Sequence, residues 1–313
     1  MGEGEHFYKL LPAWRRFRRG KQSMEVLAFH AELERHLAEL ANELRMGAYR
    51  HGGYRERLIA DKKERRLLIA GVRDRLVHRL IYERLVVDFD NRFDPDVYSG
   101  RVGKGLERAV CRTQALLSSP DCGYTWRLDI RRFFESVEHD VLLRLLRGHP
   151  CWTLCRQVID SYDVGFGRGI PIGNLTSQVF ANIYLNEFDR YVRHHIRPRG
   201  YVRYGDDVVL FFATRRAAYV AKEQGSRWLG NELGLAVNPK NNYIGAAGEL
   251  HFLGHIITPS TIEADAFCIK KARERVNFRN LGSYQRIRLP TEVKDALNRR
   301  ILVEIEAIND SIY

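Results

Sequence analysis

Residues 201–212 read YVRYGDDVVLFF, so two apolar segments flank a short turn that carries Asp206 and Asp207. This pattern predicts an antiparallel β-hairpin with acidic residues at its turn. Adjacent carboxylates that rise from a buried sheet cost free energy unless a cation neutralises them, and a hard divalent cation with oxygen ligands can do so. The hairpin therefore predicts an antiparallel sheet and a metal site. A solvent-exposed acidic turn is the alternative.

Asp129 offers a third carboxylate, because it lies near the end of the apolar segment 124–130. If this segment is a strand beside the 201–212 hairpin, the three carboxylates converge. Two Mg²⁺ ions between them could activate a 3′ hydroxyl and hold a triphosphate, which is the two-metal arrangement for in-line phosphoryl transfer. A set of aspartates without Cys or His ligands favours Mg²⁺ over zinc, and Mn²⁺ is the alternative ion.

The composition points to a polyanionic partner. The chain has 313 residues, a formal net charge of +12 and a pI near 9.6. A soluble protein this basic usually binds nucleic acid, and a merely basic surface is the alternative. The five cysteines are odd in number and form no CxxC pair, so we expect free thiols. No apolar run approaches the ~20 residues of a membrane span, so we expect a cytoplasmic protein with no membrane partner.

The hydrophobic pattern predicts an α+β fold in which helices pack on an antiparallel sheet. Apolar residues recur every three or four positions where we expect helices, and they alternate or run together where we expect strands. The expected helices are 25–46, 73–87, one from about 138, 175–196, 216–233 and much of the basic tail 266–313; the expected strands are 124–130, 250–257 and the hairpins 54–69 and 201–212.

Three segments resemble the palm motifs of reverse transcriptases, in the same order and at similar spacing. Residues 128–137 (LDIRRFFESV) resemble motif A, residues 169–178 (GIPIGNLTSQ) resemble motif B, and residues 204–207 (YGDD) resemble the YxDD box of motif C. Fingers and primer-grip segments of the family resemble residues 73–78, 98–105 and 252–254. The resemblance covers most of the chain and implies a right-hand polymerase fold with fingers, an antiparallel-sheet palm and a short helical thumb.

The resemblance also implies domains and catalytic residues. The fingers and N-terminal helices would span 1–122, the palm 123–256 with a fingers insertion at about 138–172, and the thumb 257–313. Asp129, Asp206 and Asp207 would be the catalytic metal ligands, with Ile130 also at the metal site. The general acid for the leaving pyrophosphate would be Lys240, and the primer grip would be Phe252, Leu253 and Gly254.

The nucleotide site implied by the resemblance has two parts. Cations on the 54–69 hairpin can neutralise a triphosphate, and Arg66 is favoured over Lys63 and Arg65, although a solvated charge run is the alternative. Phe134 stands where the family keeps an aromatic side chain that excludes the 2′ hydroxyl of ribonucleotides, so deoxynucleotides are implied; a core aromatic is the alternative. Ile172, Gly173 and Gln178 of motif B complete the predicted nucleotide site.

Motif B resembles most closely that of diversity-generating retroelements, whose reverse transcriptases copy a template RNA and misincorporate opposite adenine. Ile172 occupies a position where most relatives have Gln, and an apolar side chain cannot make the amide contact that Gln would make. The template RNA, the RNA–DNA duplex, deoxynucleotides and a small basic multimeric accessory protein would be the partners. The alternative is a reverse transcriptase of a bacterial anti-phage defence system, possessing atypical priming or templating. Gly205, where Met or Ala is usual, weakens the assignment to a subfamily.

Two further alternatives come from other functional classes. A catalytically silent RNA-binding protein would not need the three aspartates. An RNA-dependent RNA polymerase would not need an aromatic residue at Phe134. The sequence therefore favours an RNA-directed DNA polymerase, a nucleotidyltransferase that binds RNA and Mg²⁺.

Overall fold

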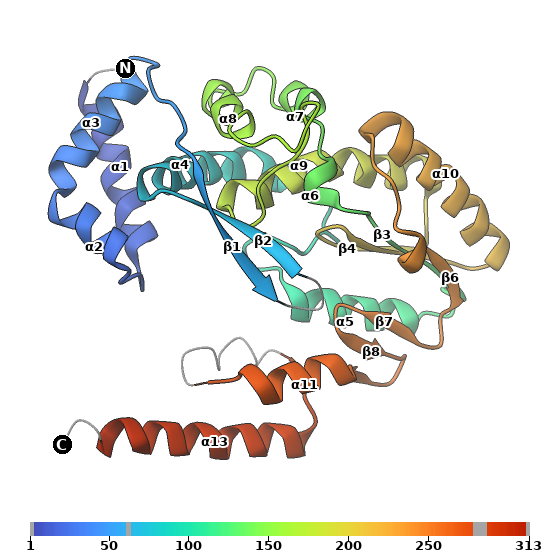
Figure 1. Ribbon diagram of the computed structural model, residues 1–313. Coiled ribbons are helices and arrows are strands. Elements are labelled where there is room, and N and C mark those ends of the chain that lie inside the picture. The colour runs from blue at the N-terminus through green and yellow to red at the C-terminus, as the bar shows by residue number, and fades with distance from the viewer. Residues whose placement is uncertain (1–2, 61–63, 278–286, 311–313) are drawn as a thin grey trace. The chain divides into compact units, whose positions relative to one another are not determined.

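The computed structural model describes residues 3–60, 64–277 and 287–310 (Figure 1). The chain forms two compact units. The first contains residues 1–94, 131–190 and 228–236, and the second contains residues 95–130, 191–227 and 237–313. The division into fingers, palm and thumb stays a prediction.

Four helices form one part of the first unit: α1 (Glu3–Arg18), α2 (Met24–Ala31), α3 (Leu33–Arg45) and α4 (Val72–Phe89). Helix α1 packs against α3 and α4 (Figure 1), and it buries Leu10 and Trp14. The expected single helix 25–46 is wrong, because two helices meet at Glu32, whose φ of −118° and ψ of 36° are not helical. The apolar spacing carries across this break, so the pattern alone did not reveal it.

The predicted hairpin at 54–69 is confirmed. Strands β1 (Tyr54–Ala60) and β2 (Glu64–Ala70) pair antiparallel, with Tyr54 opposite Ala70. The backbone N–H of Leu68 donates a hydrogen bond of 3.1 Å to the carbonyl oxygen of Ile172. The hairpin is therefore fastened at its base to the loop that carries motif B.

The other helices of the first unit are the one-turn η1 (Asp90–Arg92), α6 (Phe133–Ser136), α7 (His139–Leu145), α8 (Trp152–Ile159) and most of α9 (Leu175–Tyr191). Helix α9 is buried along much of its length, because apolar residues such as Phe180 and Phe188 occupy its interior face. The hydroxyl of Tyr184 donates a 2.7 Å hydrogen bond to the carbonyl of Leu233 and accepts one of 3.3 Å from the N–H of Glu138. This buried phenol ties three segments together.

The second unit contains a four-stranded antiparallel sheet in the order β4 (Gly200–Tyr204), β5 (Asp207–Phe212), β3 (Tyr124–Asp129) and β6 (Tyr243–Ala246). One face of the sheet carries Val202, Val209 and Phe211, which form a core cluster with α5 (Leu106–Leu117). On the other face, Trp126 packs so closely against α10 (Arg215–Leu233) that a Cβ at Gly225 would lie 2.5 Å from its ring. Both faces are covered, which explains the nearly continuous apolar run of β5.

The rest of the second unit consists of short strands and the C-terminal helices. Strands β7 (Leu250–Phe252), β8 (His255–Ile257) and β9 (Ile262–Ala264) form a three-stranded antiparallel sheet. The expected single strand 250–257 is wrong, because Leu253 and Gly254 turn the chain with φ of 52° and 76°. Helices α11 (Ala266–Arg275) and α13 (Thr291–Asp310) pack on each other (Figure 1). Two short helical segments complete the unit, η2 (Val192–Ile196) and η3 (Pro239–Asn241).

The observed architecture confirms the α+β prediction with antiparallel sheets. The five cysteines, all of which lie within the described residues, form no disulfide bond. In the part of the chain that the structure describes, no helix is long and apolar enough to cross a membrane.

The first unit also contains a pair of imidazoles, one of which is buried. The Nε2 atoms of His51 and His78 are 2.9 Å apart, and His78 is only 1% exposed. Burial lowers the pKa of His78 to about 3, and the neighbouring His51 and Arg75 contribute to this shift. An imidazole with a depressed pKa contributes stability that is present above its ordinary pKa and is lost as the pH falls toward the folded value.

We therefore predict that the free energy of unfolding falls by about 2 kcal/mol between pH 7 and pH 5, because the unfolded chain takes up a proton near pH 6.5 and the folded chain does not. Urea unfolding at pH 7, 6 and 5 measures this loss. A His78→Gln variant, which cannot be protonated, should show a correspondingly flatter dependence. Equal pH dependence in the two chains would contradict the prediction.

Candidate active site

The fold places Asp129 and Asp207 directly opposite each other. Asp129 is the last residue of β3, Asp207 is the first residue of β5, and the antiparallel register pairs them. Directly opposed residues in an antiparallel pair have Cβ atoms about 4.5–5.5 Å apart and share one face of the sheet. Two of the three predicted carboxylates are therefore neighbours, although they come from positions that are far apart in the sequence.

Asp206 lies in the turn that joins β4 to β5, next to Asp207 and half-buried. The turn has only two residues, and Gly205 has a φ of 65°. Two-residue hairpin turns require a positive φ at their first central residue, which favours glycine. This requirement gives a local reason for Gly205 where the resembled family usually has Met or Ala.

Two asparagines that the sequence analysis missed hold the Asp129 carboxylate. The Nδ2 atoms of Asn238 and Asn241 donate hydrogen bonds of 2.8 and 3.1 Å to Oδ2 of Asp129. The backbone N–H of Asn238 also donates to the carbonyl oxygen of Asp129, at 2.8 Å. Residues 238–241 form η3 and the turn before it, and Ile130 forms an isolated bridge with Val237. Oδ2 is thus committed to this loop, and Oδ1 stays available for another ligand.

Arg127 provides the positive charge beside Asp207. Its Nη2 donates a 3.3 Å hydrogen bond to Oδ1 of Asp207, and its Nη1 donates one of 2.5 Å to the carbonyl oxygen of His251. The guanidinium also lies 5.9 Å from the ring centre of Phe252. Arg127 therefore connects the acidic end of the sheet to strand β7.

Burial raises the pKa of Asp207 above its ordinary value, Arg127 acts in the opposite direction, and the neighbouring Asp129 adds to the rise. The charge of Asp129 thus disfavours the ionised form of Asp207 even with Arg127 present. Within the described residues, no three His, Cys, Asp or Glu side chains are gathered so as to hold a metal ion by themselves. The donor set nevertheless fits a hard divalent cation, because it consists of carboxylate oxygens whose negative charge Arg127 balances only in part.

The first unit carries the predicted nucleotide-site residues of motifs A and B. Phe133 is buried against Tyr184, with ring centres 6.4 Å apart, and Phe134 is only half-buried. The two neighbouring rings thus differ in burial, although their centres are only 5.3 Å apart. In motif B, Ile172 is half-buried, whereas Gly173 and Gln178 are exposed. A Cβ at Gly173 would lie 3.3 Å from the side chain of Leu67.

Two of the three predicted triphosphate cations, Arg65 and Arg66, lie on β2. Arg66 is 75% exposed, and its nearest described acidic partner is Glu56 at 4.0 Å. The backbone of Arg65 pairs with Ile59, and Lys63 lies outside the described residues. Arg66 therefore keeps a solvent-exposed guanidinium that an anion can reach.

The remaining predicted residues lie in the second unit. Lys240 is exposed within η3, between the two asparagines that bind Asp129. Phe252 is buried and contributes to the core cluster of the sheet, whereas Leu253 and Gly254 form the β7–β8 turn. Lys240 therefore belongs to the loop that binds the Asp129 carboxylate. Arg127 connects the predicted primer-grip residue Phe252 to the carboxylate of Asp207.

Comparison with known proteins agrees with the resemblance in the motifs. A family model described as "Reverse transcriptase (RNA-dependent DNA polymerase)" matches residues 59–257, which is more than half of the chain. Protein YkfC of Escherichia coli K12 is 29% identical over 190 residues, which cover 55% of this chain and 49% of YkfC. An uncharacterized 91 kDa protein in the cob intron of Schizosaccharomyces pombe is 26% identical over 156 residues, covering 44% of this chain and 18% of that protein. The chain thus spans at most about half of either relative.

Solved structures share the fold at low sequence identity. Apo telomerase from Candida tropicalis superposes with a TM-score of 0.53 and 9% identity, covering 75% of this chain and 54% of the telomerase chain. Telomerase from Candida albicans, in complex with a fragment of telomeric RNA, gives a TM-score of 0.55 and 12% identity, covering 89% and 58%. These similarities confirm a polymerase-type fold.

We predict that an Arg127→Met variant loses about 2 kcal/mol of stability, because Asp207 then keeps its charge without a partner and the bond to His251 disappears. Adding Asp207→Asn to this variant should recover roughly half of the loss, since it removes the unpaired charge. Urea unfolding of the wild-type chain, the two single variants Arg127→Met and Asp207→Asn, and the double variant measures the interaction free energy between the two side chains. As a control, Arg190→Met removes an exposed arginine that pairs with Glu187 on its own helix, and should cost less than about 0.5 kcal/mol. Strictly additive effects of the two substitutions would contradict the proposed pairing.

Proposed function

Because the chain belongs to the reverse transcriptase (RNA-dependent DNA polymerase) family, we propose that it is an RNA-directed DNA polymerase that copies a template RNA into cDNA. The observation that carries the proposal is the cross-strand pair of Asp129 and Asp207, with Asp206 in the adjoining turn. A structural or purely RNA-binding protein gains nothing from placing like charges at a half-buried sheet end. The free-energy cost of placing these like charges together is explained if the carboxylates hold the metal ions that catalysis needs.

In this proposal Asp129, Asp206 and Asp207 hold two Mg²⁺ ions, together with the backbone at Ile130. The ions, when bound, would polarise the 3′ hydroxyl of the primer and neutralise the triphosphate. Asn238 and Asn241 fix the orientation of the Asp129 carboxylate through its Oδ2 atom, and Oδ1 would be the oxygen that binds an ion. Arg127 opposes the rise in the pKa of Asp207 and holds its carboxylate in place. Mn²⁺ would replace Mg²⁺ at the same oxygen ligands.

The remaining residues are assigned by their exposure and position. Arg66, together with Lys63 and Arg65, neutralises the incoming triphosphate. Phe134, which is half-buried, excludes the 2′ hydroxyl of ribonucleotides, and Ile172, Gly173 and Gln178 contact the nascent base pair. Lys240, which is exposed next to the Asp129 loop, donates a proton to pyrophosphate. Phe252, Leu253 and Gly254 hold the primer strand.

For the biological role, we propose error-prone synthesis in a diversity-generating retroelement, with a small basic multimeric protein as accessory partner and a cytoplasmic location. The supporting feature is Ile172 in motif B, where an apolar side chain cannot donate or accept the hydrogen bonds of a glutamine. The second candidate is a reverse transcriptase of an anti-phage defence system. A neighbouring variable gene with a matching template repeat would favour the retroelement, and a toxic effector gene would favour defence.

The catalytic proposal predicts Mg²⁺-dependent extension of a DNA primer on an RNA template with deoxynucleotides. Asp129→Asn and Asp207→Asn should each lower the rate at least about 100-fold, because each removes several kcal/mol of transition-state stabilisation. Asp140→Asn changes an exposed carboxylate on α7 and should leave the rate unchanged. Gel-based primer extension, with and without EDTA, measures the rates. Undiminished extension by Asp129→Asn would contradict the assignment of the site.

Ribonucleotides serve as the substrate control in the same assay. Wild-type chain should extend poorly with ribonucleoside triphosphates, and Phe134→Ala should relieve this exclusion, because the ring that meets the 2′ hydroxyl is gone. Equal use of both substrates by the wild-type chain would support an RNA-dependent RNA polymerase instead.

The retroelement proposal predicts that Ile172→Gln lowers misincorporation opposite adenine relative to the other template bases, because the amide can again form hydrogen bonds near the base pair. Sequencing of cDNA made on a defined RNA template measures the error spectrum. Ile172→Val keeps an apolar side chain and should preserve the errors. An unchanged adenine error rate in Ile172→Gln would refute the proposed cause.

A further inference from the structure

A cavity of about 230 Å³ lies within the first unit, where α4 meets the segment after α1 and the start of α9. Three cations contribute to its lining, Lys21, Arg75 and Arg79, together with His78 and Asn174. Among the described residues, none that line it is acidic. All the residues that line it belong to the first unit, whereas the aspartates of the candidate active site belong to the second.

The cations around this cavity are not fully neutralised. Arg75 pairs with Glu25 at 3.0 Å, but Glu25 also pairs with Arg55 at 2.7 Å. Likewise, Arg79 pairs with Glu83 at 3.0 Å, and Glu83 also pairs with Arg16. Two carboxylates therefore serve four arginines, and Lys21 adds a fifth positive charge to the cluster.

Lys21 and Arg75 share one aromatic ring. The Nζ of Lys21 lies 4.3 Å from the ring centre of Phe17, and the guanidinium of Arg75 lies 5.3 Å from it. Burial lowers the pKa of Lys21, and the charges of Arg75 and Arg79 lower it further. Cations held this close to one another gain free energy from an anion placed between them.

Buried polar atoms at the cavity also lack partners. Asn174 is 4% exposed and His78 is 1% exposed. Within the described residues, Nδ2 of Asn174, Nδ1 of His78 and Nε of Arg75 make no hydrogen bond. The amide and guanidinium nitrogens can only donate, and buried donors normally have an acceptor. The missing group is therefore an acceptor.

The start of α9 adds a further preference for negative charge. This helix has 17 residues and begins at Leu175, directly after Asn174. The N-terminus of a helix carries a partial positive charge and unsatisfied N–H groups, which favour phosphate and similar anions. Donors thus reach the cavity from three separate segments, which suits an oxyanion with several oxygens better than a carboxylate with two.

We propose that this cavity binds a phosphate group, held by the Asn174 amide and by Lys21, Arg75 and Arg79. The bound group joins the residues after α1 to α4 and to the beginning of α9. The carbonyl of Ile172, two residues before Asn174, accepts a hydrogen bond from β2. The phosphate therefore also stabilises the contact between the loop before α9 and the β1–β2 hairpin. The phosphate comes either from a free phosphate or nucleotide, or from the backbone of an RNA strand.

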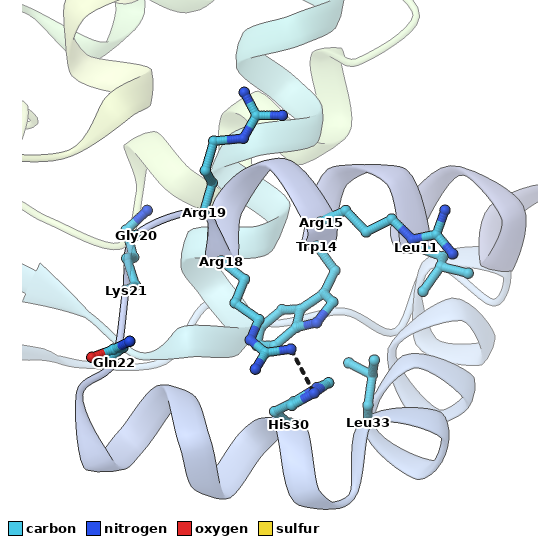
Figure 2. A pocket seen from close by; sticks show the side chains of 10 residues that line it. All are labelled: Leu11, Trp14, Arg15, Arg18, Arg19, Gly20, Lys21, Gln22, His30 and Leu33. Carbon is cyan, nitrogen blue, oxygen red and sulfur yellow. Dashed lines mark hydrogen bonds between the residues drawn. The ribbon is translucent and has the colours of Figure 1, made fainter.

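A neighbouring groove of about 600 Å³ contains an arginine that can serve as a control position (Figure 2). The groove shares Lys21 with the cavity and is also lined by Arg15, Arg18 and Arg19. Figure 2 shows Arg18 close to His30, and the Nη1 atom of Arg18 lies 2.6 Å from the Nε2 atom of His30. Arg19 is exposed and does not line the cavity. Arg19→Met therefore removes one nearby positive charge and leaves the cavity intact.

The test is phosphorus NMR of inorganic phosphate titrated with the full chain at constant ionic strength. The phosphate line should broaden with wild-type chain, and Asn174→Asp should weaken binding at least about tenfold, since a carboxylate then occupies the place of the anion. Arg79→Met should also weaken binding, and it serves as a second variant if Asn174→Asp does not fold by circular dichroism. Arg19→Met should change the affinity less than about twofold, because exposed charges are screened.

Two competitors distinguish the sources of the phosphate. If a single-stranded RNA narrows the line again and a deoxynucleoside triphosphate does not, the group is a backbone phosphate; the reverse result identifies a nucleotide or free phosphate. The proposal is overturned if wild-type chain leaves the line unchanged, or if Arg19→Met weakens binding as much as Asn174→Asp. The outcome does not depend on polymerase activity, so failure here leaves the proposed function standing.

Discussion

The antiparallel register that sets Asp129 opposite Asp207 is the constraint on which the rest of the site depends. A shift of one residue would send one carboxylate to the other face of the sheet. The two-residue turn at Gly205 sets the register of β4 against β5. The register of β3 against β5 follows from side chains that are buried on both faces of the sheet. The carboxylates therefore meet because the core of the second unit leaves the strands only one way to pair.

The same constraint explains why polar residues gather around this end of the sheet. Asn238 and Asn241 satisfy one oxygen of Asp129, and Arg127 offsets the charge of Asp207. These contacts do not fully offset the repulsion and the burial of the two carboxylates. The pKa of Asp207 is therefore still raised, which means that its ionised form is destabilised in the folded chain. A fold optimised for stability alone would replace such a pair by apolar residues. The retained cost is consistent with a site that binds cations during catalysis.

Local patterns allowed much of the fold to be predicted. The 201–212 and 54–69 hairpins, the strand ending at Asp129 and helix α9 follow from apolar period and turn chemistry, and the structure contains them all. Two boundaries were missed, since a non-helical Glu32 and a turn at Leu253–Gly254 interrupt patterns that otherwise continue. Asn238, Asn241 and Arg127 could not be assigned, because their partners lie far away in the sequence and only the folded sheet brings them together.

The central claim is that the paired carboxylates bind divalent ions in a polymerase complex. Electron paramagnetic resonance of Mn²⁺ tests it most directly, in a complex of the chain with an RNA template, a DNA primer that ends in a dideoxynucleotide, and the matching deoxynucleoside triphosphate. We expect bound Mn²⁺ in the wild-type complex, and an affinity at least about tenfold weaker with Asp129→Asn, because a charged ligand is lost. Equal Mn²⁺ binding by the wild-type and Asp129→Asn chains would contradict the claim.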